Sequence, residues 1–292
     1  MTDPLLRLQY RLTNRDHTLL GWLADHGVLT TPQIAHALFP SVDVAQERLL
    51  ALTRAGVLAR FRPQRPDGGT HPYHYVLDQL GANIVASQRG EDQPRRDQAR
   101  HRRWHLTNRA NLPHLLGVNQ FFINLAAHAR THPGCRLERW WPAARCQRCG
   151  AFADASDETV VRAYTPVIRP DGHGIWAENG QRVPFFVEYD LGTEPLPTLI
   201  DKLDRYTHLV RHIHRSWPVL FSLPGAIRER NLQRRLADTR LHVAVATTVR
   251  DPAAFGTTSP AEAVWWLHQS EDRRVRLADL ADRVVDLRRR AA

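Results

Sequence analysis

The sequence predicts an α/β protein, α+β overall, in which an N-terminal winged helix-turn-helix precedes a mixed sheet with flanking helices. Two observations predict this class. The first eighty residues contain three helical apolar patterns followed by two short strands. Beyond residue 111 the order becomes helix, three strands, helix, strand, helix, strand, which is typical of a mixed sheet covered by helices. The predicted boundaries are 12–86 for the winged helix, 87–111 for an arginine-rich linker, 112–270 for the sheet domain and 271–292 for a basic helical tail.

The winged helix is predicted from helix start and stop signals. A first helix begins at Asn14 and ends at Gly27, and a second starts at 30–33, where threonine and proline stand in the first turn. A third helix covers 42–55 and ends at Gly56. Two strands, 57–62 and 73–77, surround a polar turn rich in proline and glycine.

In a winged helix the third helix enters the major groove of DNA, and the hairpin touches the backbone or the minor groove. The side chains predicted to face DNA on the third helix are Gln46, Glu47, Arg48, Thr53 and Arg54, and those on the hairpin are Arg60, Arg62 and Arg65. The alternative is a winged helix that serves protein pairing. Winged helices often dimerise, and the sequence leaves the oligomeric state open.

The charge of the chain favours a polyanionic partner. Its formal net charge is +10, and positive charge is concentrated in 89–109, 228–240 and 288–290. Double-stranded DNA is the simplest such partner, although each basic run has the alternative reading of a solvated face. No apolar stretch reaches the length of a signal peptide core or a membrane span, so a cytoplasmic location without membrane association is expected.

The linker, 87–111, is polar, rich in arginine and poor in large apolar side chains. It is expected to be a solvated connector that wraps DNA or a disordered hinge, and the sequence does not separate these.

Three cysteines, an odd number, argue against a disulfide framework. Cys146 and Cys149 form a CxxC pair, which supplies two of the four ligands that structural zinc needs. Cys135 and His173 are available to complete such a site. The other reading is a pair of unliganded thiols in a loop.

Three acids are predicted to converge at the open end of one hairpin. Asn179-Gly180 is a typical two-residue hairpin turn between strands 174–177 and 183–190. Counting outward from this turn places Asp171 opposite Glu188, and Asp190 projects on the same side as Glu188. Carboxylate oxygens suit Mg²⁺ or Mn²⁺, so Asp171, Glu188 and Asp190 are the predicted metal ligands.

Lys202 is the only lysine among the 40 basic Lys and Arg residues, which indicates a role that a guanidinium does not fill. It lies on a predicted helix, 198–214, that returns beside the acids, and Tyr206 shares its helix face. A metal held by Asp171 and by Glu188 or Asp190 would polarise a phosphodiester and activate a water. Lys202 would orient or deprotonate that water or offset the developing charge, and lysine suits this because burial can depress its pKa. The alternative is a solvated strand end whose acid pairs with Lys202.

The motifs RPDG, FFVEYDLGTE and the helix K-x-x-x-Y together resemble the replication-relaxation family of actinobacterial plasmids and integrative elements, over roughly residues 12–250. The resemblance implies a sheet domain similar to the PD-(D/E)XK nuclease fold. Pro170-Asp171 matches its first element and Glu188 the acid of its second. Asp190 stands where that element has lysine, so Lys202 is read as a migrated lysine. The catalytic residues implied are therefore Asp171, Glu188, Asp190 and Lys202.

The resemblance implies a DNA-binding protein that nicks or relaxes plasmid or element DNA by metal-dependent phosphodiester hydrolysis, together with other replication or mobilisation proteins. The alternative is a non-catalytic origin-binding or mobilisation accessory protein with a degenerate nuclease fold. A transcriptional regulator would need an effector pocket that the sequence does not indicate. A relaxase acting through Tyr206 would need a cluster of metal-binding histidines that the sequence does not show.

Overall fold

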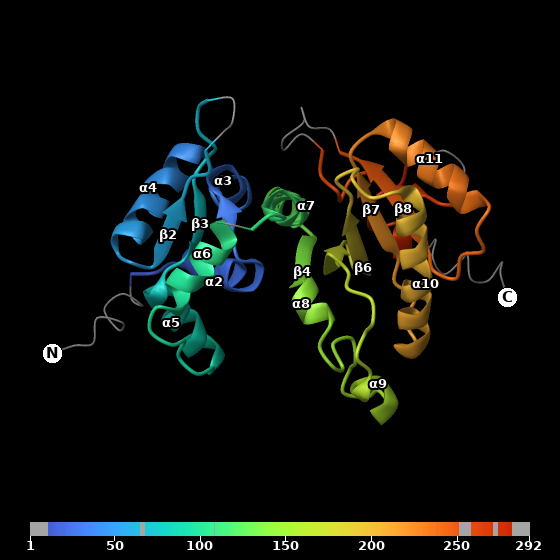
Figure 1. The fold of residues 1–292 in the computed structure, drawn as a ribbon, viewed down its shortest axis with the longest axis horizontal. Coiled ribbons are helices and arrows are strands. Elements are labelled where there is room, and N and C mark those ends of the chain that lie inside the picture. The colour runs from blue at the N-terminus through green and yellow to red at the C-terminus, as the bar shows by residue number, and fades with distance from the viewer. Residues whose placement is uncertain (1–10, 65–67, 108, 251–257, 271–273, 282–292) are drawn as a thin grey trace. The chain divides into compact units, whose positions relative to one another are not determined.

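The computed structural model describes residues 11–64, 68–107, 109–250, 258–270 and 274–281. The chain divides into two compact units, residues 1–123 and 124–292, and the division falls within helix α7 (Leu112–Thr131). Each unit has its own sheet, of three and of six strands (Figure 1). The predicted mixture of helices with sheets is therefore confirmed. Among the described residues, no helix combines the length and the apolar character needed to span a membrane.

The first unit contains the three predicted helices and the two predicted strands. Its elements are α2 (Asn14–His26), β1 (Leu29–Thr30), α3 (Thr31–Leu38), α4 (Val42–Arg54), β2 (Leu58–Phe61), β3 (His74–Leu77), α5 (Gln79–Arg89) and α6 (Gln98–Thr107). The sheet order is β1-β3-β2 and both pairings are antiparallel, so β3 is the central strand. The two-residue strand β1 was not predicted, because its apolar character merges with the start of α3.

Helix starts in this unit follow the predicted capping chemistry with one shift. Thr30 caps α3, and its hydroxyl and the Gln33 side chain form a reciprocal capping box, with Pro32 in the first turn. The cap of α2 is Thr13 rather than Asn14, because Thr13 and Asp16 form the same kind of box. Ser41 caps α4.

The segment predicted as a solvated connector, 87–111, contains the end of α5 and all of α6 instead. Ala99 and Leu106 are the buried residues of α6. Leu106 packs in a cluster with Val28, Val76 and Leu112. Two apolar residues seven positions apart bury one side of a short helix, and the many arginines of this segment hide that pattern in the sequence.

The second unit is built on one mixed sheet in the order β4-β5-β6-β7-β8-β9. Its elements after α7 are β4 (Cys135–Pro142), α8 (Ala143–Cys146), α9 (Thr159–Ala163), β5 (Gly172–Glu178), β6 (Gln181–Tyr189), α10 (Leu196–His212), β7 (Val219–Leu223), α11 (Ala226–Ala237), β8 (Val245–Val249) and β9 (Trp266–Leu267). β4, β5 and β6 are antiparallel, β6, β7 and β8 are parallel, and β9 is antiparallel to β8. The predicted order of helices and strands is thus present, with short helices α8 and α9 added.

Helices α10 and α11 lie beside the parallel strands (Figure 1). Apolar residues of both helices, including Leu203 and Leu232, share one buried cluster with Phe186, Phe221 and Val245 of the sheet. Because α10 follows β6 and α11 follows β7, each helix begins at the edge where the parallel strands end. This edge positions the side chains described next.

The described part of the predicted basic helical tail starts with a bridge and a turn. Val275 forms a bridge with Trp265, and Leu277 and Leu280 are buried. Residues 277–279 form a turn, and residues 280 and 281 are helical. The remainder of the predicted tail, 271–273 and 282–292, lies outside the described residues.

Candidate functional site

The β5–β6 hairpin brings Asp171 and Glu188 together. Its turn pairs Glu178 with Gln181, as predicted, and its last register pair is Gly172 with Val187. Asn179 and Gly180 both have positive φ, +48° and +87°, as a type I′ turn requires. The next step of this register sets Asp171 opposite Glu188. Asp171 Oδ2 accepts a hydrogen bond of 2.8 Å from the backbone N–H of Tyr189, which closes the open end of the hairpin.

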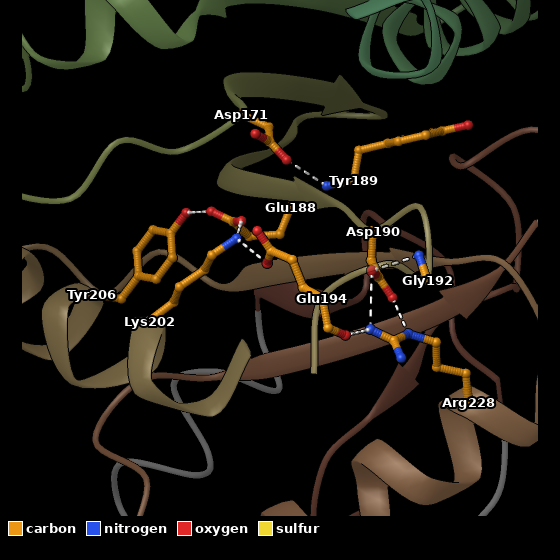
Figure 2. A network of polar contacts seen from close by, with 9 residues as sticks. All are labelled: Asp171, Glu188, Tyr189, Asp190, Gly192, Glu194, Lys202, Tyr206 and Arg228. Atoms are coloured by element: carbon orange, nitrogen blue, oxygen red, sulfur yellow. Dashed lines mark hydrogen bonds and ion pairs between the residues drawn. The ribbon is translucent and has the colours of Figure 1, made fainter. Parts of the chain in front are cut away.

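Glu188 is held by two side chains from α10. It is 2% exposed. Lys202 Nζ lies 3.0 Å from Glu188 Oε2, and the Tyr206 hydroxyl donates to Glu188 Oε1 (Figure 2). Lys202 also lies 3.1 Å from Glu194 Oε2. The spacing of four residues places Lys202 and Tyr206 on one face of α10, so the two reach the same carboxylate.

The electrostatics of this cluster follow from burial and charge. Burial, and then the charge of Asp171, raise the pKa of Glu188 to about 7, although Lys202 and Tyr206 oppose the shift. For Lys202, burial acts to lower the pKa, but the charge and hydrogen bond of Glu188 outweigh it and the pKa is raised. The prediction that Lys202 has a depressed pKa is therefore wrong, because its carboxylate partner keeps the ammonium protonated near neutral pH.

Asp190 has different partners. It is 6% exposed, and its carboxylate accepts hydrogen bonds from Arg228 of α11 and from the Gly192 backbone N–H at 2.8 Å. Arg228 also donates to the Glu194 carbonyl. Figure 2 shows Asp190 and Arg228 on one side of Glu194, with Lys202 and Tyr206 on the other. Asp190 therefore binds an arginine of α11, whereas Glu188 binds two side chains of α10.

Within the part of the chain that the structure describes, no group of three or more His, Cys, Asp or Glu side chains is arranged to hold a metal ion. Of the three predicted metal ligands, Asp171 and Glu188 lie opposite each other, whereas Asp190 binds Arg228.

Arg250 supports the backbone beside this site. It donates to the carbonyls of Asp190 and Ser222, and its guanidinium lies 3.9 Å from the centroid of the Tyr189 ring. The sequence analysis missed Arg228 and Arg250 as site residues. The signal that locates them is topological, because both follow parallel strands whose carboxyl ends meet at the edge where β6 ends.

The residues predicted to face DNA on α4 lie in different environments. Gln46 and Arg54 are exposed. Arg48 instead binds Asp16, with Nε 3.0 Å from Oδ1, and donates to the Arg11 carbonyl at 3.1 Å. Since Asp16 is also part of the α2 capping box, Arg48 ties α4 to the start of α2.

The hairpin arginines share one aromatic side chain. The guanidiniums of Arg60 and Arg62 lie 4.0 Å and 4.1 Å from the centroid of the Tyr73 ring. Arg60 lies on β2 and Arg62 directly follows it, so these residues, two apart, project on one face towards Tyr73, which directly precedes β3. The third predicted hairpin residue, Arg65, lies outside the described residues.

The CxxC thiols have unlike surroundings. Cys146 is fully buried, and burial raises the pKa of its thiol to about 12, whereas Cys149 is exposed. His173 is also buried, and its Nδ1 lies 2.9 Å from the Phe185 carbonyl. All three cysteines are free, and the zinc site stays a prediction.

A family model described as replication-relaxation matches residues 20–223, which is more than half of the chain. The chain therefore belongs to the replication-relaxation family, whose name suggests a role in the replication or relaxation of plasmids or similar elements. No curated protein and no solved structure matches the chain.

Proposed function

We propose that this protein binds plasmid or integrative-element DNA and nicks it by metal-dependent phosphodiester hydrolysis in the second unit. The observation that carries the proposal is the Glu188 cluster. A buried acid opposite Asp171 is contacted by the chain's single lysine at 3.0 Å.

The order of elements supports a nuclease fold for this unit. An antiparallel hairpin is followed by a parallel strand in the order α7, β4, β5, β6, α10, β7. This order accords with the PD-(D/E)XK fold that the chain resembles. In this reading Asp171 and Glu188 take the positions of the two acids. Lys202 replaces the lysine whose usual position is occupied by Asp190.

Asp171 and Glu188 would hold Mg²⁺ or Mn²⁺. Burial and the nearby charge of Asp171 make ionised Glu188 unfavourable, and a divalent cation beside both acids would relieve that cost. Each Glu188 oxygen accepts one hydrogen bond from α10 and keeps further acceptor capacity, so the residues present fit a cation. Such an ion polarises a phosphodiester oxygen and lowers the pKa of a bound water.

The protonated Lys202 would act as a fixed positive charge rather than as a base. A cation beside the phosphate stabilises the additional negative charge of the pentavalent transition state. Tyr206 would orient Glu188 by binding its other oxygen. Arg228 would hold Asp190 and the Glu194 backbone, so that Glu194 remains beside Lys202.

The first unit would select the DNA as a winged helix, with α4 in the major groove and the β2–β3 hairpin along the backbone. Gln46 and Arg54 are exposed on α4, and Arg60 and Arg62 lie on the hairpin. Arg48 is better described as a stabilising residue, because Asp16 binds it. Arginine contacts to phosphate would make the affinity depend on salt.

A second function is favoured by one observation. Asp190 is neutralised by Arg228, and a non-catalytic origin-binding protein with a degenerate nuclease fold requires no metal-binding acids. Such a protein would recruit other replication or mobilisation proteins to DNA.

The two functions are separated by cleavage of a supercoiled plasmid that carries the element's own origin, in Mg²⁺, Mn²⁺ or EDTA. Wild type, Asp171→Asn and Lys202→Ala are compared, with exposed Arg211→Ala as the control. The nuclease proposal expects metal-dependent nicking by wild type and by the control, and its loss in the two site variants. Tight DNA binding without nicking in either metal would support the accessory function instead.

A further inference from the structure

Helix α6 carries an exposed tryptophan. Trp104 is 63% exposed, and it is the one aromatic among the exposed large hydrophobic residues of the described chain. A tryptophan buries 150–250 Å² in a typical core, so leaving it in water forgoes a large hydrophobic gain. An exposed tryptophan on a regular helix therefore indicates a contact surface.

The exposure follows from how α6 packs. Ala99 and Leu106 are its buried positions, and the Arg102 guanidinium donates to the Ala24 carbonyl at 2.6 Å. With 100° per residue, Trp104 projects away from the side that holds Ala99 and Leu106. Trp104 therefore lies on the solvent-exposed side of the helix, where a flat partner can stack on the exposed part of its indole.

A hollow of about 610 Å³ lies along the same helix. It is open to solvent and lined by Gln98, His101, Arg102, His105, Leu106 and Arg109. Trp104 and His105 are adjacent, with ring centroids 5.1 Å apart and the rings at 77°. The tryptophan therefore stands at the side of the hollow, where a flat group can reach it and its extension can enter the hollow.

The charge of this surface selects an anion. Arg100, Arg102, Arg103 and Arg109 lie on or directly after α6, and α6 itself contains no acidic residue. Asp97, just before the helix, pairs with Arg100 across 3.7 Å between two exposed side chains, which is a weak interaction. Each guanidinium carries five N–H donors, so the arginines that bind backbone or side-chain oxygens keep others for phosphate.

We propose that the α6 face, defined as residues 98–107 and 109, binds single-stranded DNA, with one base stacked on Trp104 and the neighbouring phosphates on the arginines. A duplex hides the faces of its bases, whereas a single strand offers them to an aromatic side chain. Single-stranded DNA arises wherever an origin is opened or a nicked strand is displaced. Binding of single-stranded DNA by this surface is a separate activity from the proposed nicking and does not depend on it.

The test is a binding titration with full-length protein in EDTA, so that cleavage plays no part. The probes are a fluorescein-labelled oligothymidine of about 20 nucleotides, long enough for one binding surface, and a labelled duplex of the same length. Trp104→Ala is expected to weaken binding of the single strand about tenfold and binding of the duplex less than about twofold, and Trp104→Phe to restore most of the loss. Thermal unfolding checks that each variant folds. We expect each to fold, because position 104 is exposed.

Charge is tested in the same assay by salt dependence. Arg100→Gln is expected to reduce the slope of log K against log salt by about 0.7 for the single strand. Exposed Arg211→Gln on α10 is the matched control and is expected to leave the slope unchanged. The proposal is overturned if Trp104→Ala leaves single-strand affinity unchanged, or weakens the duplex equally. An Arg211→Gln effect equal to that of Arg100→Gln, or tighter binding of oligouridine than of oligothymidine, also overturns it.

Discussion

Glu188 and Asp190 are two buried acids two residues apart, and they have opposite kinds of partner. Glu188 is contacted by Lys202 and Tyr206, which each place one polar group on a different oxygen of its carboxylate. Asp190 is contacted by Arg228, a planar and permanently charged fork that binds both of its oxygens, and by a backbone N–H. In the proposed function Glu188 belongs to the reacting centre, whereas Asp190 and Arg228 form a clamp that holds the chain.

The largest effect is expected when each of the two cations, Lys202 and Arg228, is replaced by the other type of basic residue. Lys202→Arg should lower the rate of plasmid nicking by about 100-fold, the usual loss when one group that stabilises transition-state charge is misplaced. Arg228→Lys should lower it by less than about tenfold, because a lysine still binds one Asp190 oxygen. Initial rates of nicking in Mg²⁺ measure both. An Arg228→Lys loss as large as that of Lys202→Arg would place Asp190 in the reacting centre.

A second effect is the pH dependence of stability. The folded pKa of Glu188, about 7, exceeds its ordinary value of 4.5, so between these values the folded chain keeps a proton that the unfolded chain has lost. The contribution of Glu188 to the free energy of unfolding is therefore full below about pH 4.5 and is lost as pH rises through 7, by about 3 kcal/mol.

Urea unfolding of wild type and Glu188→Gln at about pH 5 and about pH 7.5 measures this term, because the glutamine does not titrate and other groups cancel in the comparison. Wild type should lose about 2 kcal/mol more than the variant over this interval. Parallel profiles would show that Glu188 does not carry the raised pKa.

The clamp should contribute mainly to stability. Arg228→Met leaves the buried Asp190 carboxylate without its guanidinium and should cost about 2 kcal/mol, less than for a fully buried pair because the Gly192 N–H remains. Adding Asp190→Asn should restore part of the loss, since the amide oxygen still accepts from Gly192. Denaturant midpoints measure both, and an additive double variant would argue that the two residues do not interact.

The smallest effect sharpens the role of Tyr206. Tyr206→Phe removes one hydrogen bond to Glu188 and should cost about 1 kcal/mol. That hydrogen bond lowers the pKa of Glu188, so its removal should move the pH interval of lost stability upward. The pH profile is the discriminating measurement, because a merely structural loss would lower stability equally at every pH.

The sequence predicts well those features whose signals lie within a few residues. The Asn179-Gly180 turn sets the hairpin register by its own backbone geometry, and that register brings Asp171 opposite Glu188. Lys202 and Tyr206 reach one carboxylate because a helix repeats near four residues.

What the sequence does not predict depends on distant partners. Asp190 and Arg228 are 38 positions apart, and nothing near Asp190 indicates that a guanidinium arrives from α11. The raised pKa of Lys202 requires knowing that its partner is a buried carboxylate rather than apolar surface. Helix α6 was hidden because only two apolar residues bury it among many arginines.

The order of the parallel strands decides where this chain can be shortened. The family match ends at residue 223, the last residue of β7, yet β7 pairs with β8 along five residues that are all buried. A chain cut there would expose β7 as a bare hydrophobic edge, ready to pair with another molecule and aggregate. It would also lack Arg228 and Arg250, and with them the groups that neutralise Asp190 and bind its carbonyl. The region shared by the family is therefore shorter than the smallest piece of this protein that can be expected to stay soluble.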